Sequence, residues 1–81
     1  MKPCLAKQFA RAYFAAGKRN DDFRTLIKQI DPKVHISMHT KGAALFVFSD
    51  DSWGECTFYD DDTADVWGYP KRARKGGNLG L

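Results

Sequence analysis

The hydrophobic period of this chain changes once, at Pro32. Before Pro32 apolar residues recur at helical spacing, and after it they alternate with polar residues in short segments. The first pattern is typical of helices with one buried face, and the second of strands with one buried face. Because both kinds of element need their apolar side covered, this order predicts a helical layer packed against a sheet.

Two helices are predicted before Pro32. The apolar stripe of the first, over about residues 3–16, consists of Leu5, Ala6, Phe9, Ala12, Tyr13 and Ala16. The stripe of the second consists of Phe23, Leu26, Ile27 and Ile30. Gly17 suits the end of the first helix and Asn20 the start of the second. The second helix should end at Asp31, because a residue before proline disfavours the helical conformation.

Four strands are predicted after Pro32, over residues 34–39, 43–49, 53–59 and 64–69. Pro70 should end the last strand, because proline cannot donate a hydrogen bond to a neighbouring strand. Every connection is short enough for a hairpin. The predicted fold class is therefore α+β: an N-terminal antiparallel helical hairpin packed on one face of a four-stranded antiparallel β-meander (ααββββ). Residues 1–70 form one domain, and residues 71–81 form a basic, glycine-rich C-terminal tail.

The two faces of the predicted sheet differ in what covers them. The side chains expected to face the helices are Val34, Ile36, Met38, Phe46, Phe48, Cys56, Phe58 and Val66. Those expected on the far side are His35, His39, Leu45, Val47, Tyr59, Trp67 and Tyr69. Monomers rarely expose an apolar patch of this size, so the far side is a candidate interface. Two alternatives are that the tail covers it or that the sheet curls around it.

Charge is segregated along the chain, which a net charge of +3 conceals. Residues 1–49 carry nine bases and three acids, residues 50–70 carry seven acids and no base, and residues 71–81 carry four bases. The acids gather at two predicted turns, Asp50–Asp51 and Asp60–Asp65, with Glu55 between them. Those turns lie at opposite ends of a meander. Segregated charge of this kind points to charged partners.

No residue pattern in the sequence indicates catalysis, a metal or a cofactor. His35 and His39 match no zinc spacing, and Asp60–Asp65 lacks the glycine and glutamate of a calcium loop. Cys56 is expected to be a buried thiol rather than a nucleophile paired with a histidine. A small core also argues against an enzyme. We therefore predict no catalytic residue, metal or cofactor.

The predicted location of the protein is the cytoplasm. The N-terminal residues do not resemble a signal peptide, and no apolar run is long enough for a membrane helix. Cys4 and Cys56 are expected to be free thiols, with a disulfide between them as the alternative.

The favoured function is a small non-enzymatic protein-binding module. Compact, aromatic-rich, charge-segregated proteins of this general character resemble inhibitors and modulators made by phages and mobile elements. The predicted partner is a host protein that processes nucleic acid, bound through sheet aromatics and acidic turns. The predicted partner-binding residues are Asp50, Asp51, Glu55, Tyr59, Asp60, Asp61, Asp62, Asp65, Trp67 and Tyr69.

The alternative function is a nucleic-acid-binding accessory protein. Basic residues on the first helix with an aromatic beside them can hold a phosphate backbone and stack a base. The predicted residues are Lys7, Arg11, Phe14, Lys18, Arg19, Lys71, Arg72, Arg74 and Lys75. A homodimer through the aromatic patch is also compatible with the sequence, and a membrane partner is not expected.

Overall fold

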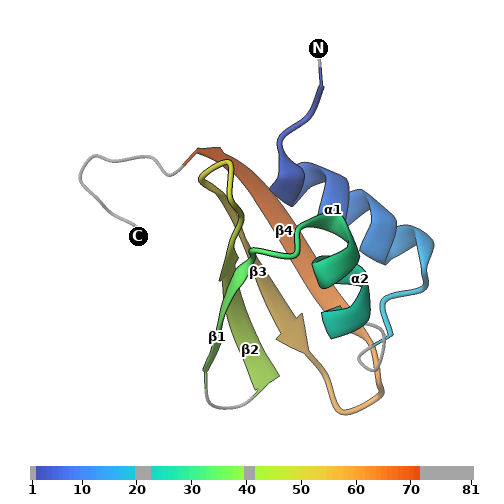
Figure 1. The fold of residues 1–81 in the computed structure, drawn as a ribbon. Coiled ribbons are helices and arrows are strands. Elements are labelled where there is room, and N and C mark those ends of the chain that lie inside the picture. Colours follow the sequence, from blue (N-terminus) through green and yellow to red (C-terminus); the bar gives the residue numbers. More distant parts are fainter. Residues whose placement is uncertain (1, 20–22, 40–41, 72–81) are drawn as a thin grey trace.

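The computed structural model of the protein describes residues 2–19, 23–39 and 42–71. Its elements are α1 (Leu5–Ala15), α2 (Phe23–Ile30), β1 (His35–His39), β2 (Ala43–Val47), β3 (Ser52–Phe58) and β4 (Ala64–Lys71). The strands form one antiparallel sheet in the order β1-β2-β3-β4. Both helices lie on the same side of this sheet (Figure 1). The predicted α+β fold and its ααββββ order are confirmed.

The end of α1 follows from the backbone at Gly17 and Lys18. Both residues have positive φ, +88° and +56°, and the Lys18 amide donates to the Tyr13 carbonyl at 3.1 Å. The Gly17 amide donates to the Phe14 carbonyl, also at 3.1 Å, which completes the glycine-based helix end predicted here. Ala16, predicted to be part of the apolar stripe, is exposed because the chain already leaves the helix there. The predicted cap of α2 at Asn20 lies outside the described residues.

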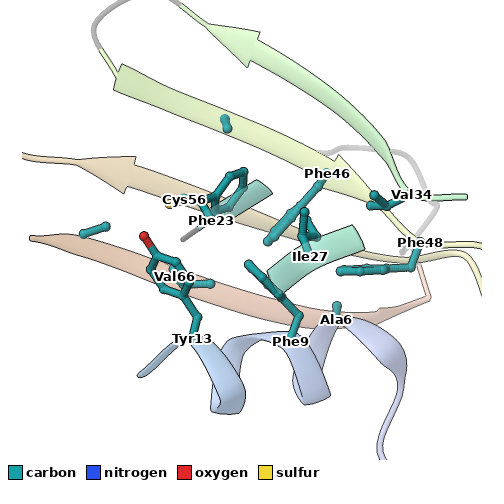
Figure 2. Packing of buried hydrophobic residues seen from close by; sticks show 12 residues of the cluster. Ala6, Phe9, Tyr13, Phe23, Ile27, Val34, Phe46, Phe48, Cys56 and Val66 are labelled. Carbon is teal, nitrogen blue, oxygen red and sulfur yellow. The ribbon is translucent and has the colours of Figure 1, made fainter. Parts of the chain in front are cut away.

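The core lies between the helices and the sheet, and the Phe9 side chain points into it from α1 (Figure 2). The Phe9 ring centroid lies 5.5 Å from those of Tyr13 and Phe23, and 5.0 Å from that of Phe46. Two of these pairs are edge-to-face, which is the geometry that aromatic rings prefer. The buried apolar residues are Ala6, Phe9, Tyr13, Phe23, Ile27, Val34, Ala44, Phe46, Phe48, Cys56, Ala64 and Val66.

The predicted inward set is confirmed apart from Met38, whose side chain is 51% exposed. Ile36 and Phe58 are partly buried and pack against the core. Met38 lies near the end of β1, the sheet edge opposite β4, whereas α1 packs on β4 and β3. The helical layer therefore leaves that end of β1 uncovered, although Met38 has the strand phase of an inward residue.

The prediction that Pro70 ends the last strand is wrong. β4 continues to Lys71, which pairs with Ser52, while Trp53 pairs with Tyr69. Pro70 therefore has no opposite residue and is the extra residue of a bulge. Because β4 is an edge strand and a bulge residue needs no partner, the missing proline N–H is tolerated.

Two Trp-Gly dipeptides, Trp53-Gly54 and Trp67-Gly68, lie side by side on β3 and β4, and the second explains how closely α1 approaches the sheet. Gly54 and Gly68 are direct partners on β3 and β4, on the face toward the helices. A Cβ atom on Gly68 would lie 2.4 Å from the Ala6 carbonyl oxygen in α1. Gly68 therefore admits the helix backbone, whereas Gly54 makes room for the Phe46 ring. Because strand residues alternate, the two tryptophans are on the other face.

Candidate functional site

The sheet face away from the helices carries a continuous set of apolar and aromatic side chains. Burial alternates along β2, β3 and β4, so the residues between the buried ones face outward. We call this the open sheet face. Its residues, in rows across the strands, are His35, Val47, Trp53 and Tyr69; then Ser37, Leu45, Glu55 and Trp67; then Ala43, Thr57 and Asp65.

Three aromatic residues cluster on the β3–β4 side of the open sheet face. Trp53 and Tyr69 are paired across the strands and stack with their ring centroids 4.4 Å apart and their planes 20° apart. Trp67, two residues from Tyr69, is 59% exposed. Trp53 was absent from the predicted site residues. Its strand phase, shared with Glu55, was the sequence signal that could have placed it there.

Glu55 lies between apolar side chains in the middle of this face. Its direct partners are Leu45 on β2 and Trp67 on β4, and its side chain is exposed. Within the described part of the chain, the Glu55 carboxylate makes no hydrogen bond and no ion pair. The acid is therefore available to a ligand from outside.

Asp65 and Tyr59 extend the open sheet face toward the β3–β4 turn. The Tyr59 hydroxyl donates to Asp65 Oδ2 at 2.8 Å, and this hydrogen bond raises the pKa of Tyr59. Lys18 Nζ lies 3.8 Å from Asp65 Oδ1 and 4.9 Å from the centre of the Phe14 ring. Lys18 and Phe14, both predicted to bind nucleic acid, are thus already in contact with each other, and Lys18 neutralises part of the acidic charge.

The turn between β3 and β4 exposes three of the predicted acids, Asp60, Asp61 and Asp62. Asp61 Oδ1 accepts hydrogen bonds from the Thr63 amide at 3.1 Å and from its hydroxyl at 2.5 Å. These bonds lower the pKa of Asp61. Asp62 has a φ of +68°, a conformation that aspartate tolerates in turns. The turn therefore presents three exposed carboxyl groups while the hydrogen bonds of Asp61 hold its backbone in place.

Asp50, another predicted partner-binding residue, has a role within the fold. Its Oδ2 accepts the Leu5 amide at 2.8 Å, and its Oδ1 accepts the Ser52 amide at 2.9 Å. The Ser52 hydroxyl also donates to Asp50 and accepts the Ala6 amide at 3.0 Å. Two free N–H groups of the first turn of α1 are thus satisfied from the β2–β3 turn, at the positive end of the helix dipole.

Asp31, whose side chain is 4% exposed, also stabilises the β2–β3 turn. Its carboxylate accepts the Ser49 amide at 2.7 Å and the Lys33 amide at 3.0 Å. Burial raises the pKa of both Asp31 and Asp50, but the hydrogen bonds they accept outweigh it. The pKa of each carboxyl is therefore below its ordinary value. Of the acids in this turn, Asp51 is left fully on the surface.

Acidification is expected to destabilise the protein below about pH 4 because of these two carboxyls. Asp31 and Asp50 have lower pKa values in the folded than in the unfolded chain, so folding favours their ionised forms. Their contribution to stability is complete above the unfolded-state pKa and is lost as the pH falls through the folded-state values. Melting temperatures between pH 7 and pH 2 measure this loss.

The matched variant for this prediction is Asp50→Asn. It should melt at a lower temperature than the wild type at pH 7, because an amide can accept fewer of the three hydrogen bonds. It should also lose less stability on acidification, since one of the carboxyls with a lowered pKa is gone. An unchanged pH profile in this variant would contradict the capping role.

Cys56 and His35, which a thiol–imidazole pair would need side by side, are on opposite faces of the sheet. Cys56 is 1% exposed in the core, and burial raises its pKa to about 12, whereas His35 is exposed. A thiol of this kind remains protonated and is a poor nucleophile. Cys4 and Cys56 are both free, as predicted.

Charge in the folded protein is divided between the two layers. Neither α1 nor α2 contains an acid, and both expose bases: Lys7 and Arg11 from α1, Arg24 and Lys28 from α2. Residues 42–71 contain seven acids and one base, Lys71, the last residue of β4. The helical layer is therefore basic and the sheet layer acidic. The predicted binding residues Arg72, Arg74 and Lys75 lie outside the described residues.

Comparison of the chain with protein-family models, with curated proteins and with solved structures found no match. Within the described residues, no three or more His, Cys, Asp or Glu side chains come together as a group that could hold a metal ion. No helix in the described ranges is long and apolar enough to cross a membrane. A functional hypothesis must therefore rest on the surfaces described above.

Proposed function

We propose that the protein is a non-enzymatic protein-binding module whose contact surface is the open sheet face. The observation that carries this proposal is the exposure of Trp67, 59%, beside the stacked Trp53 and Tyr69. Exposing an aromatic group of this size to water is unfavourable, and tryptophan and tyrosine are the residues that most often dominate binding energy at interfaces. Leu45 and Val47 extend the apolar surface to β2.

The charge of the sheet layer supports a basic partner surface. Glu55, Asp65 and the Asp60–Asp62 turn lie on or beside the open sheet face, at the β3–β4 side. Complementary charge speeds association and fixes the orientation of the complex more than it adds affinity. We propose a host nucleic-acid-processing protein as the partner, bound at its basic nucleic-acid channel and modulated as phage-type inhibitors modulate their targets.

Affinity capture with a matched pair of variants tests this proposal. The wild type and Phe14→Ser are expected to retain the same partner, whereas Trp67→Ser should lose it. Phe14 is the matched control because it is also an exposed aromatic, 44%, but on α1. Capture followed by mass spectrometry identifies the partner, and the purified pair then gives the affinity. Equal binding of both variants to that partner would show that the open sheet face is not the contact.

A second candidate function is nucleic-acid binding through the helical layer. It is favoured by the exposed bases of α1 and α2 and by the lack of acids in those two helices. In this case affinity for an oligonucleotide should fall steeply with salt, with a log–log slope of about 0.9 per phosphate contact. The double variant Lys7→Gln, Arg11→Gln should then reduce the slope by about 2. A slope near zero in the wild type would eliminate this function.

A further inference from the structure

We propose that the open sheet face binds an arginine side chain of the partner protein, with the guanidinium stacked on Trp67 and paired with the Glu55 carboxylate. This inference rests on the proposed function and specifies the chemistry of the same surface. It assigns the centre of recognition to one cross-strand pair, where an aromatic ring and an acid stand side by side.

The first argument is the position of the two residues. Glu55 and Trp67 are direct partners on β3 and β4 and belong to the same face. Side chains in such a pair start about 4.5–5.5 Å apart at their Cβ atoms, so one planar group can contact both. Both side chains are exposed. No backbone rearrangement is therefore needed for a ligand to reach them.

The second argument is that the fold does not explain Glu55. Glutamate is depleted in strands, and here it lies between Leu45 and Trp67 rather than at an edge. Asp31, Asp50, Asp61 and Asp65 all hold hydrogen bonds within the chain, but Glu55 holds none among the described residues. A carboxylate without an internal partner, flanked by apolar groups, is complementary to an external cation.

The third argument selects arginine among possible ligands. Its guanidinium is planar, so it can lie flat against an indole ring while its N–H groups pair with a carboxylate at its edge. A lysine ammonium has no plane to stack. A nucleic-acid base could stack on Trp67, but the adjacent Glu55 and Asp65 would repel its phosphates. A second copy of the protein would bring the same acids face to face.

The neighbouring rows complete the surface around this pair. On one side the stacked Trp53 and Tyr69 offer an apolar platform for the methylene groups of the arginine or for the next partner residue. On the other side Asp65, oriented by the Tyr59 hydroxyl at 2.8 Å, adds further negative charge, which Lys18 at 3.8 Å neutralises in part. Among the described residues, Lys71 is the one lysine or arginine of the sheet layer, and the Trp53–Tyr69 row separates it from Glu55.

The experiment uses three decapeptides in which glycine alternates with arginine, lysine or the uncharged arginine analogue citrulline. Each is titrated into the full chain while the backbone amides and the two indole N–H groups are followed by NMR. The arginine peptide should bind, with the largest shifts at the Trp67 indole and at Glu55. The lysine peptide should bind about fivefold more weakly, and the citrulline peptide not measurably.

Four variants separate the specific site from general attraction. Glu55→Gln should weaken binding of the arginine peptide about tenfold, as expected for loss of a charge-assisted hydrogen bond. Asp51→Asn removes the same charge from the exposed β2–β3 turn, at a φ of +70° that asparagine also tolerates, and should change binding less than twofold. Trp67→Leu should weaken it about fivefold, and Phe14→Leu should leave it unchanged.

Several outcomes would overturn the inference. Equal effects of Glu55→Gln and Asp51→Asn would mean attraction by net charge alone. Shifts of the Trp67 indole by a single-stranded oligonucleotide, or dimerisation abolished by Trp67→Leu, would assign the face to a different occupant. Tenfold tighter peptide binding by a chain ending at Lys71 would assign it to Arg72 or Arg74 of the chain itself.

The captured partner distinguishes this inference from the proposed function. If Trp67→Ser loses the partner but Glu55→Gln keeps it at full affinity, the open sheet face is the contact and the arginine site is wrong. If both variants keep the partner, the proposed function fails as well. If both variants lose the partner and the peptides bind as expected above, the proposed function and the arginine site are both supported.

Discussion

Replacement of Phe9 by alanine is expected to reduce the free energy of unfolding by about 3–5 kcal/mol. Phe9 is 0% exposed, and its ring lies against four other aromatic rings, those of Tyr13, Phe23, Phe46 and Phe48. These rings come from both helices and from the sheet, so they cannot all move into the space that the missing ring leaves. The loss therefore includes burial, ring contacts and a residual cavity.

Urea denaturation of the wild type, Phe9→Ala and Phe14→Ala measures this prediction. Phe14 is on the same helix but 44% exposed, so Phe14→Ala should change stability by less than about 0.5–1 kcal/mol. Since a domain of this size is typically stable by only about 5–15 kcal/mol, Phe9→Ala could be unfolded in a substantial fraction at 25 °C. A loss below about 1 kcal/mol would mean that the aromatic cluster is not the centre of the core.

The order of the elements could be predicted because each leaves a local signal in the sequence. The period of Leu5, Phe9 and Tyr13 identifies a helix, and the alternation after Pro32 identifies strands. The signals for where an element ends are local as well, as the positive φ of Gly17 at the end of α1 illustrates. The burial of Met38 and the strand end at Pro70 were predicted wrongly because both depend on other elements. The exposure of Met38 depends on how far the helical layer extends, and the pairing around Pro70 depends on a bulge opposite β3.

The candidate site could be predicted only in part, for the same reason. The positions of Trp67 and Tyr69 could be predicted because strand phase alone places them on the open sheet face. The structural role of Asp50 could not be predicted, since its hydrogen bond with the Leu5 amide joins segments 45 residues apart. The pairing of Glu55 with Trp67 required the register between β3 and β4, which depends on the whole sheet.

The division of charge between the layers gives the protein two different surfaces for encounter. Under the proposed function a basic partner would meet the acidic sheet layer, whereas in the second candidate function nucleic acid would meet the bases of α1 and α2. The proposed modulator of a nucleic-acid-processing protein would benefit from this arrangement, because the sheet layer resembles a phosphate backbone in charge while the aromatic residues anchor the complex. The open sheet face depends in turn on a sheet whose opposite face fits α1 closely.

Because α1 fits so closely against the sheet, Gly68→Ala is the second variant for which we expect a large loss of stability. A Cβ atom at Gly68 would lie 2.4 Å from the Ala6 carbonyl oxygen and 3.0 Å from the Lys7 amide nitrogen. Both are backbone atoms of α1, so no side chain can rotate to make room, and the helix itself must move. That movement would disturb Phe9 in the core and the hydrogen bonds from Leu5 and Ala6 to the β2–β3 turn.

We expect Gly68→Ala to cost about 3 kcal/mol, at the upper end of the range for overpacked cores. At an open site with an ordinary backbone conformation, the same change would stabilise the protein by about 0.4–1 kcal/mol, so the sign of the effect tests the contact. The control is Gly17→Ala, where no atom lies within 4 Å but φ is +88°. It should reduce the free energy of unfolding by only about 1–2 kcal/mol, which is the cost of a left-handed backbone conformation for alanine. Urea denaturation measures both, and a Gly68→Ala variant as stable as the wild type would show that α1 does not pack directly on β4.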